Sequence, residues 1–150
     1  MCQRSLRTER TREEMVARIR AFSPVHRRCW GEMAHSRVFA HLGDALRLSL
    51  GELGNETSIA DAPFASRRRE WIHELLWPEG KVQAPPEGFL TAPTDWEADR
   101  ELLLELVVRF ANEPPTRLAS AHPLLGEMSG EDWDVLMFRH LDHHLRQFGA

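Results

Sequence analysis

The C-terminal stretch His140-Leu-Asp-His143-His144-Leu-Arg-Gln147-Phe-Gly-Ala150 places three histidines within five positions of a predicted helix. Residues four apart lie on the same face of an α-helix, so the side chains of His140 and His144 are expected to project together. Their face also carries large apolar residues: Trp133, Leu136, Met137, Leu141 and Phe148. The pattern therefore predicts two imidazoles in the core-facing arc, where a polar group without a partner costs free energy. A metal ion would supply that partner.

Two helices are predicted in the first third of the chain. Thr11-x-x-Glu14 has the pattern of a capping box, and the apolar stripe behind it predicts a helix that ends at Ser23-Pro24, with charged residues upstream able to extend it. A second helix is predicted over about residues 33–50, and Gly51 is its expected C-terminal stop. The apolar face of this helix includes His41, which is therefore also expected to point inward.

The middle of the chain predicts less regular structure. We expect a loop at residues 54–63, a short helix over residues 66–77 and an extended connection rich in Pro and Gly over residues 81–93.

Two more helices follow. Thr94-x-x-Glu97 has the pattern of a second capping box, and it opens a strongly periodic stretch that Asn112-Glu-Pro-Pro115 stops. Ser129, with Asp132 three residues later, is expected to cap the last helix. No stretch alternates convincingly with the period of two that is typical of a strand. The predicted fold class is therefore all-α, a four-helix bundle with one additional short helix. It forms a single domain over residues 1–150, with residues 1–10 able to be flexible.

Composition narrows the class of protein. A chain of 150 residues with 42% hydrophobic and 28% charged residues is typical of one soluble domain, and the net charge of −4 offers no overall basic field for nucleic acid. Residues 1–28 hold eight Arg against three Glu, but the two interleave as on a solvated helix, which we favour over a nucleic-acid arm. Cys2 and Cys29 are too few for a disulfide framework, and no stretch has the pattern of a membrane span or a secretory signal. We expect a cytoplasmic protein with no nucleic-acid or membrane partner.

Three inward histidines predict a metal site. His41, His140 and His144 could supply three nitrogen ligands and leave further positions open, which is the arrangement of a catalytic rather than a structural metal. Neutral imidazole suits Zn, Ni, Cu and Fe, so the ligand type leaves the metal open. His143 could replace His144, although its place at the edge of the apolar stripe favours a position beside the site or on the surface.

Two polar residues lie one helical turn from these histidines. Asp44 follows His41 by three residues and could orient that ligand or move a proton; a carboxylate on the helix surface is an equally good interpretation. Gln147 follows His144 by three residues and could hydrogen-bond a bound group; the alternative is a polar, frayed helix end. Asp44 and Gln147 are the predicted catalytic residues.

Several short motifs carry a family resemblance. They are Trp30-Gly-Glu-Met33, His41-Leu-Gly-Asp44, Leu50-Gly51, His122-Pro-Leu-Leu-Gly126, Trp133 and the stretch from His140 to Gly149. Together, over roughly residues 14–150, they resemble a bacterial family within the DinB/YfiT-like superfamily. That resemblance implies a DinB/YfiT-like four-helix bundle with one metal-binding histidine on the second helix and two on the last, which are His41, His140 and His144 here. Many members read His-x-x-His-His-Arg-Gly-Gln; here Leu145-Arg146-Gln147 follows His144, so the Arg-Gly pair is altered.

The resemblance also implies a function. Characterised members of the superfamily include thiol-dependent isomerases and transferases, so we expect a metal-dependent enzyme, with Zn or Ni, that activates water or a low-molecular-weight thiol against a small electrophilic substrate. Hydrolysis and thiol transfer both stay open. Arg37 and Arg146 are the predicted contacts for the carboxylates of an anionic thiol. The competing hypothesis is a non-catalytic metal-binding or stress-related binding protein, which a fourth protein ligand would favour. A homodimer stays open.

Overall fold

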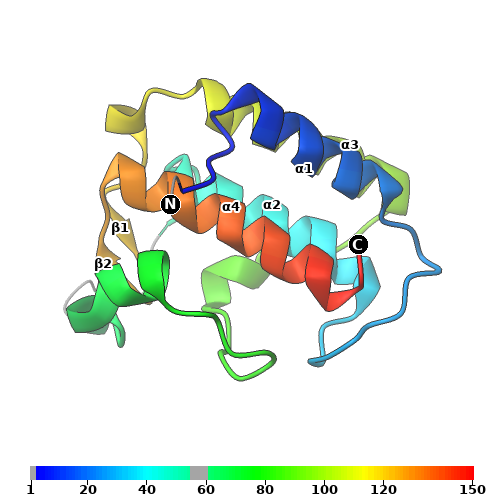
Figure 1. Ribbon diagram of the computed structural model, residues 1–150, viewed down its shortest axis with the longest axis horizontal. Coiled ribbons are helices and arrows are strands. Elements are labelled where there is room, and N and C mark those ends of the chain that lie inside the picture. The colour runs from blue at the N-terminus through cyan, green and yellow to red at the C-terminus, as the bar shows by residue number, and fades with distance from the viewer. Residues whose placement is uncertain (1–2, 55–60) are drawn as a thin grey trace.

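The computed structural model describes residues 3–54 and 61–150, and within them most of the chain is helical (Figure 1). The long helices are α1 (Glu9–Ala21), α2 (Val38–Ser49), α3 (Trp96–Asn112) and α4 (Gly130–Gln147). The all-α prediction is confirmed, with one small departure: the two-residue strands β1 (Ala121–His122) and β2 (Gly126–Glu127) pair antiparallel. Strands this short are too brief to produce the alternating pattern by which a sequence announces them.

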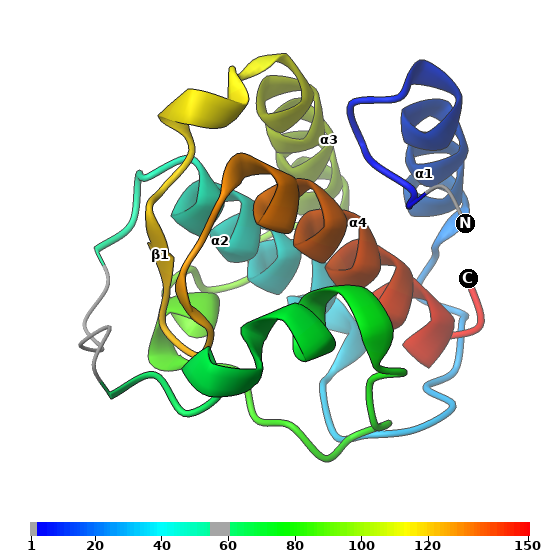
Figure 2. The ribbon, with the colours of Figure 1, turned by 60° about the vertical axis from the view of Figure 1, so that its left-hand side comes forward.

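The four helices form a bundle in which α1 and α2 each pack on both α3 and α4. Helix α2 contacts α3 and α4, and α1 contacts the same two helices, so α4 runs alongside α2 (Figure 2). Large side chains from all four helices are fully buried between them, together with two from outside the helices and one from a short turn: Trp133, Phe22, Phe39, Phe110, Leu6, Met15, Ile19, Leu42, Leu46, Ile72, Leu103 and Leu106. This apolar core positions the one helix pair, α2 and α4, that carries the predicted histidines.

The helix starts differ from the capping predictions in two of three cases. Thr11 does not cap α1, because the N-cap is Thr8 and Thr11 is buried within the first turn. The cap of α3 is Asp95, whose carboxylate accepts the Ala98 N–H at 3.0 Å, one residue later than the Thr94 pattern indicates. The capping box of α4 is confirmed, since Ser129 and Asp132 bond each other's backbone.

The connections contain short helical turns rather than the single short helix expected. The second predicted helix is split into a 3₁₀ turn, η1 (His35–Arg37), and α2, which Gly51 ends at a φ of 75°, as expected. Over residues 66–77 the chain forms a 3₁₀ turn, η3 (Ala65–Arg67), and then a π-helix, η4 (Glu70–Glu74). The connection at 81–93 contains η5 (Pro86–Phe89), and η6 (Pro115–Arg117) follows α3. In Figure 1 the segment with η3 and η4, in green, lies on the opposite side of α4 from α1. Cys2 and most of the predicted loop at 54–63 lie outside the described residues.

The Arg-rich N-terminal part is held against the bundle. Within residues 3–10, which we expected to be able to move, Leu6 is fully buried and Arg7 pairs with Asp134 on α4 at 2.6 Å. Arg18 on α1 pairs with Asp142 on α4 at 2.7 Å. The excess of arginine in this region is therefore met partly by carboxylates of another helix, and it contributes to docking α1. None of the helices in the described part of the chain has both the length and the apolar character needed to cross a membrane.

Candidate metal centre

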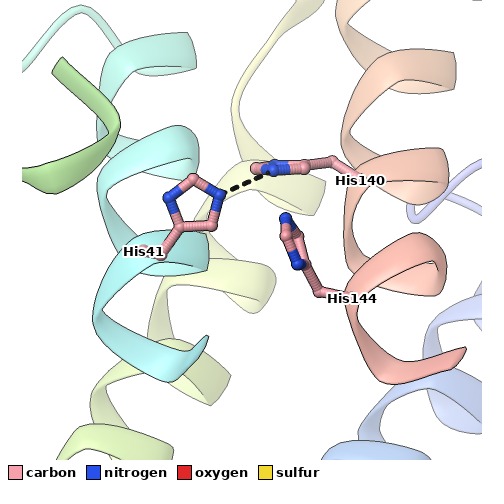
Figure 3. Close-up of side chains that lie close together, drawn as sticks. All are labelled: His41, His140 and His144. Atoms are coloured by element: carbon pink, nitrogen blue, oxygen red, sulfur yellow. Dashed lines mark hydrogen bonds between the residues drawn. The ribbon is translucent and has the colours of Figure 1, made fainter. Parts of the chain in front are cut away.

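Three histidine rings meet between α2 and α4 (Figure 3). The ring centroids of His41 lie 4.8 Å from those of His140 and of His144, and the latter two are 4.9 Å apart. The ring planes are steeply inclined to one another, at 84°, 82° and 71°. One nitrogen of each ring lies within 4.8 Å of the others, and Nε2 of His41 is 3.0 Å from Nε2 of His140. The predicted convergence of these three residues is confirmed.

Local helix geometry and helix packing each contribute to this meeting. The spacing of four brings His140 and His144 to one face of α4, as the sequence predicts. On α2, His41 is itself buried, as are Phe39 and Leu42 beside it, so its ring points into the bundle. Because α2 packs directly on α4, the two inward faces share one space.

Hydrogen bonds outside the cluster determine which ring nitrogens face inward. Nδ1 of His41 lies 2.7 Å from the carbonyl oxygen of Gly88, which can only accept, so the proton is on Nδ1 and the lone pair on Nε2. Nδ1 of His144 donates to Oε1 of Gln147 at 2.8 Å. The orientation of that amide follows from its other end, since Nε2 of Gln147 donates to the carbonyl of Trp30 at 3.1 Å. Both rings therefore present a bare Nε2 to the centre of the cluster, as metal-binding imidazoles do.

The three imidazoles are kept neutral. Burial, assisted by the neighbouring histidines, lowers the pKa of His140 well below its ordinary value and the pKa of His144 to about 3, and burial also lowers the pKa of His41. The Gly88 bond and the charge of Asp44 act in the opposite direction on the pKa of His41 without reversing it. Neutral imidazole is the form that binds a metal ion, so the residues present fit one.

The cluster is incomplete as a closed metal cage. In the part of the chain that the structure describes, it comprises three residues, without a carboxylate or thiol. His41 and His144 are buried, whereas His140 keeps partial exposure. An ion held by the three nitrogens would have coordination positions left.

Aromatic side chains surround this centre. The Phe89 ring stacks on His41 at 4.9 Å and 22°. His143 is not part of the cluster: its ring lies between two indoles, 4.6 Å from Trp30 and 5.5 Å from Trp77. The interpretation of His143 as a neighbour of the site rather than a ligand agrees with this position.

Asp44 has a different environment from the one expected. It is fully buried, and its carboxylate accepts the Thr91 N–H at 2.8 Å and the Thr91 hydroxyl at 2.5 Å. It makes no hydrogen bond to His41 within the described residues. Thr91 lies three residues after Gly88, so Asp44 anchors the segment whose carbonyl orients His41. Its position relative to the ligand is that of an indirect support.

The guanidinium groups of the two predicted arginines have different partners. Arg146 has a side chain 57% exposed and pairs with Asp142 at 2.9 Å, and the structure does not bring it to the cluster. Arg37 is half-buried over the Phe89 ring, at 5.6 Å, and its charge contributes to lowering the pKa of His41. Within the described residues Arg37 has neither an ion pair nor a hydrogen bond through its guanidinium.

Two supporting groups lie outside the predicted set of site residues. Gly88 approaches His41 so closely that a Cβ there would lie 3.2 Å from Cε1 of the ring. Its only signal in the sequence is a glycine in a proline-rich connection. Trp30 takes part through its backbone carbonyl, which its residue type does not reveal, although it stands in one of the motifs that carry the resemblance.

The sequence model of one protein family, DUF1569, matches residues 2–150. The chain belongs to the DUF1569 family. That family is described as a protein of unknown function. Comparison with curated proteins found no match, and neither did comparison with solved structures. The function has to be argued from the site itself.

Proposed function

We propose that this chain is a metal-dependent enzyme of the DinB/YfiT-like type, in which His41, His140 and His144 hold one divalent ion, Zn or Ni. The observation that carries the proposal is the convergence of three neutral imidazoles, two of them with Nε2 lone pairs directed inward by hydrogen bonds to Gly88 and Gln147.

Without a metal ion, His41 and His140 share a hydrogen bond that metal coordination would replace. Since Nε2 of His41 carries the lone pair, His140 donates an Nε2 proton to it across 3.0 Å. Binding an ion requires His140 to direct a lone pair inward instead, which a neutral imidazole achieves by shifting its proton to Nδ1. A ring that is already neutral makes this exchange without competing protonation at neutral pH.

A divalent ion held by three neutral nitrogens would act as a Lewis acid and lower the pKa of a water or thiol that it binds. The chain's own residues supply the rest. Burial excludes water from the rings of His41 and His144, and the aromatic side chains of Phe89 and Trp77 give the cluster apolar surroundings. This combination suits attack on a small electrophilic molecule, by hydrolysis or by thiol transfer.

The competing hypothesis is a non-catalytic metal-binding or stress-related binding protein. A structural site uses four protein ligands, whereas three are brought together in the described part of this chain, and one of the three, His140, is only partly buried. These features support the enzyme over the closed site.

Within the described residues no carboxylate pairs with the guanidinium of Arg37, which supports an anionic ligand there. Arg37 stacks on Phe89, which stacks on His41, so a carboxylate on Arg37 would lie within the reach of a small molecule from the metal. Arg146 already has Asp142 as its partner. We therefore assign the carboxylate of a low-molecular-weight thiol to Arg37 rather than Arg146, in a cytoplasmic enzyme that acts on a small molecule.

The test is isothermal titration of glutathione, bacillithiol and mycothiol into zinc-loaded protein, metal-free protein and the His144→Ala variant. We expect a thiol to bind the zinc-loaded protein alone. Arg37→Gln should weaken glutathione binding about 10–100-fold, the scale of one charge-assisted hydrogen bond of about 1.5–3 kcal/mol, and the matched control Arg146→Gln should leave it unchanged. Equal binding with and without metal would remove thiol transfer, and failure of the wild-type protein to bind any of the candidate metals would remove the enzyme proposal.

A further inference from the structure

The segment between α1 and η1 closes over the C-terminal end of α4. The Cys29 N–H donates to the carbonyl of Gln147 at 2.7 Å. One residue further, the carbonyl of Trp30 accepts from the side-chain amide of the same Gln147. The other end of that amide accepts from His144. The Trp30 carbonyl, more than a hundred residues away in sequence, is thus linked to the ring of His144 through the Gln147 amide alone.

Gly31 makes the close approach of this segment feasible. Its φ is +76°, in the left-handed region that side chains disfavour, and a Cβ built on it would lie 2.6 Å from Nε2 of Gln147. Gly80 also packs against Gly31, and its own Cβ would lie 3.2 Å from the Cα of Gly31. The amide of Gln147 therefore lies against a backbone that has room for it only because residue 31 has no side chain.

The orientation of this amide decides the tautomer of His144. With its NH₂ on Trp30, Gln147 presents its oxygen to His144, so Nδ1 carries the proton and Nε2 the lone pair. If the amide rotated by half a turn, its NH₂ would face Nδ1. The proton of His144 would then move to Nε2, and an N–H would point at the metal position.

We propose that the Trp30–Gly31 backbone controls the metal affinity of the three-histidine centre through Gln147, which acts as a positioning residue for His144. This inference rests on the proposed metal site. His41 needs no such relay, because the carbonyl of Gly88 can only accept and therefore holds its tautomer directly. The affinity of the site depends on the segment before η1 for one ligand and on η5 for another.

The chain offers a matched pair of variants for the test. Gly31→Ala and Gly51→Ala both place a side chain at a φ near +75°, but a Cβ at Gly51 has no heavy atom within 4 Å. The backbone strain is shared, and the displacement of Gln147 is specific to Gly31. Loss of a group that orients a metal ligand weakens binding about 10–100-fold. We expect Zn²⁺ and Co²⁺ affinity to fall about tenfold or more in Gly31→Ala and to stay within about twofold of wild type in Gly51→Ala.

A second pair probes the amide itself. Gln147→Leu removes the acceptor and should weaken metal binding about 10–100-fold, whereas Gln147→Glu keeps an oxygen on Nδ1 and should rescue most of the affinity. Because Gly31 acts through Gln147, the double variant Gly31→Ala/Gln147→Leu should bind metal no more weakly than Gln147→Leu alone. If Gly31→Ala fails to fold by far-UV circular dichroism, the Gln147 pair still tests the positioning role of the amide, and equal metal affinity in Gln147→Leu and wild type would overturn it.

A readout that needs no metal separates this inference from the proposed function. The ¹⁵N shifts of the His144 ring in metal-free protein report its tautomer. We expect the Nδ1–H tautomer in wild type and Gly51→Ala, and a mixture in Gly31→Ala and Gln147→Leu. The same tautomer in all four proteins, or equal metal affinity in the two glycine variants, would overturn the relay while leaving the metal site standing. A wild-type protein that binds no metal would overturn both.

Discussion

Histidines pack at both ends of α4, but their partners differ in charge. At the N-terminal end, His73 from η4 bonds Asp132 at 2.9 Å, beside the Ser129 cap. At the C-terminal end, His140 and His144 face His41, with no carboxylate in the cluster that the described residues form. His73 at the first end has a carboxylate partner, whereas the histidines at the second end bond neutral groups: a backbone carbonyl, an amide and one another.

The pKa shifts express the same contrast. Burial raises the pKa of Asp132, but bonds from His73 and Ser129 outweigh it and leave that pKa below its ordinary value. At the other end burial and, to a lesser extent, the neighbouring histidines lower the pKa of His144 to about 3. The first end is a completed structural pair. The second is a set of neutral imidazoles whose inward-facing lone pairs gain a favourable partner when a cation binds.

Removing a ligand should give the largest difference between the two ends. His140→Ala and His144→Ala should lose zinc affinity by more than the roughly 100-fold that an outer hydrogen-bond partner is worth, and both should keep their helical content because the apolar core holds the bundle. Elemental analysis and far-UV circular dichroism measure these two properties. His73→Ala is the control: it should keep full metal content but lose about 1–3 kcal/mol of stability, because Asp132 loses its partner. Unchanged zinc in either ligand variant would reject that residue.

Metal binding should then add stability that depends on the C-terminal end alone. Zinc at about a thousand times its Kd should stabilise the folded protein by about 4 kcal/mol, which for a domain of this size is a rise of about 10 °C in Tm. Differential scanning fluorimetry with and without zinc measures this rise. The increment should be the same in His73→Ala and absent in His140→Ala, so an increment that survives loss of His140 would place the metal elsewhere.

Acid should reveal a third kind of histidine, the half-buried His122. His122 on β1 packs on Trp133, and burial lowers its pKa from 6.5 to about 4. Its folded-state pKa is below the unfolded one, so the unfolded chain binds the proton first and stability falls as the pH drops from about 6.5 to about 4. At about 1.36 kcal/mol per unit the loss attributable to His122 is about 3 kcal/mol. Urea unfolding of metal-free wild type and His122→Gln across this range would show a shallower decline in the variant, and identical slopes would contradict the assignment.

The smallest expected effect concerns Asp44. Asp44→Asn keeps an acceptor for Thr91 but loses the charge, so we expect a stability loss of about 1–2 kcal/mol, within the range of a hydrogen bond to a charged group. Zinc affinity should change by less than tenfold, because Asp44 reaches His41 only through the segment that carries Gly88. Asp44→Glu, tested in parallel by urea unfolding and zinc titration, separates charge from shape. A loss of zinc affinity as large as that of His144→Ala would contradict this indirect role and indicate that Asp44 acts directly on the metal or its ligands.

Helix-local features were predictable from the sequence alone. The spacing of His140 and His144, the inward face of His41 and the Ser129 cap all follow from periodicities within one helix, which the nearest residues determine. The caps of α1 and α3 were misplaced because Thr, Asp and Ser crowd these helix starts, and tertiary packing selects among neighbouring N-caps that differ little in energy.

Tertiary structure alone decided what surrounds the histidines. The bonds from His41 to Gly88, from Gln147 to Trp30 and from Thr91 to Asp44 each join a helix to an irregular segment far away in sequence. Such segments carry no periodic signal, and a backbone carbonyl is the same in every residue type. The sequence by itself determined which histidines face inward on each helix, because helix geometry is local; the fold decided that His41, His140 and His144 meet and which of their nitrogens face the centre, because both depend on long-range packing.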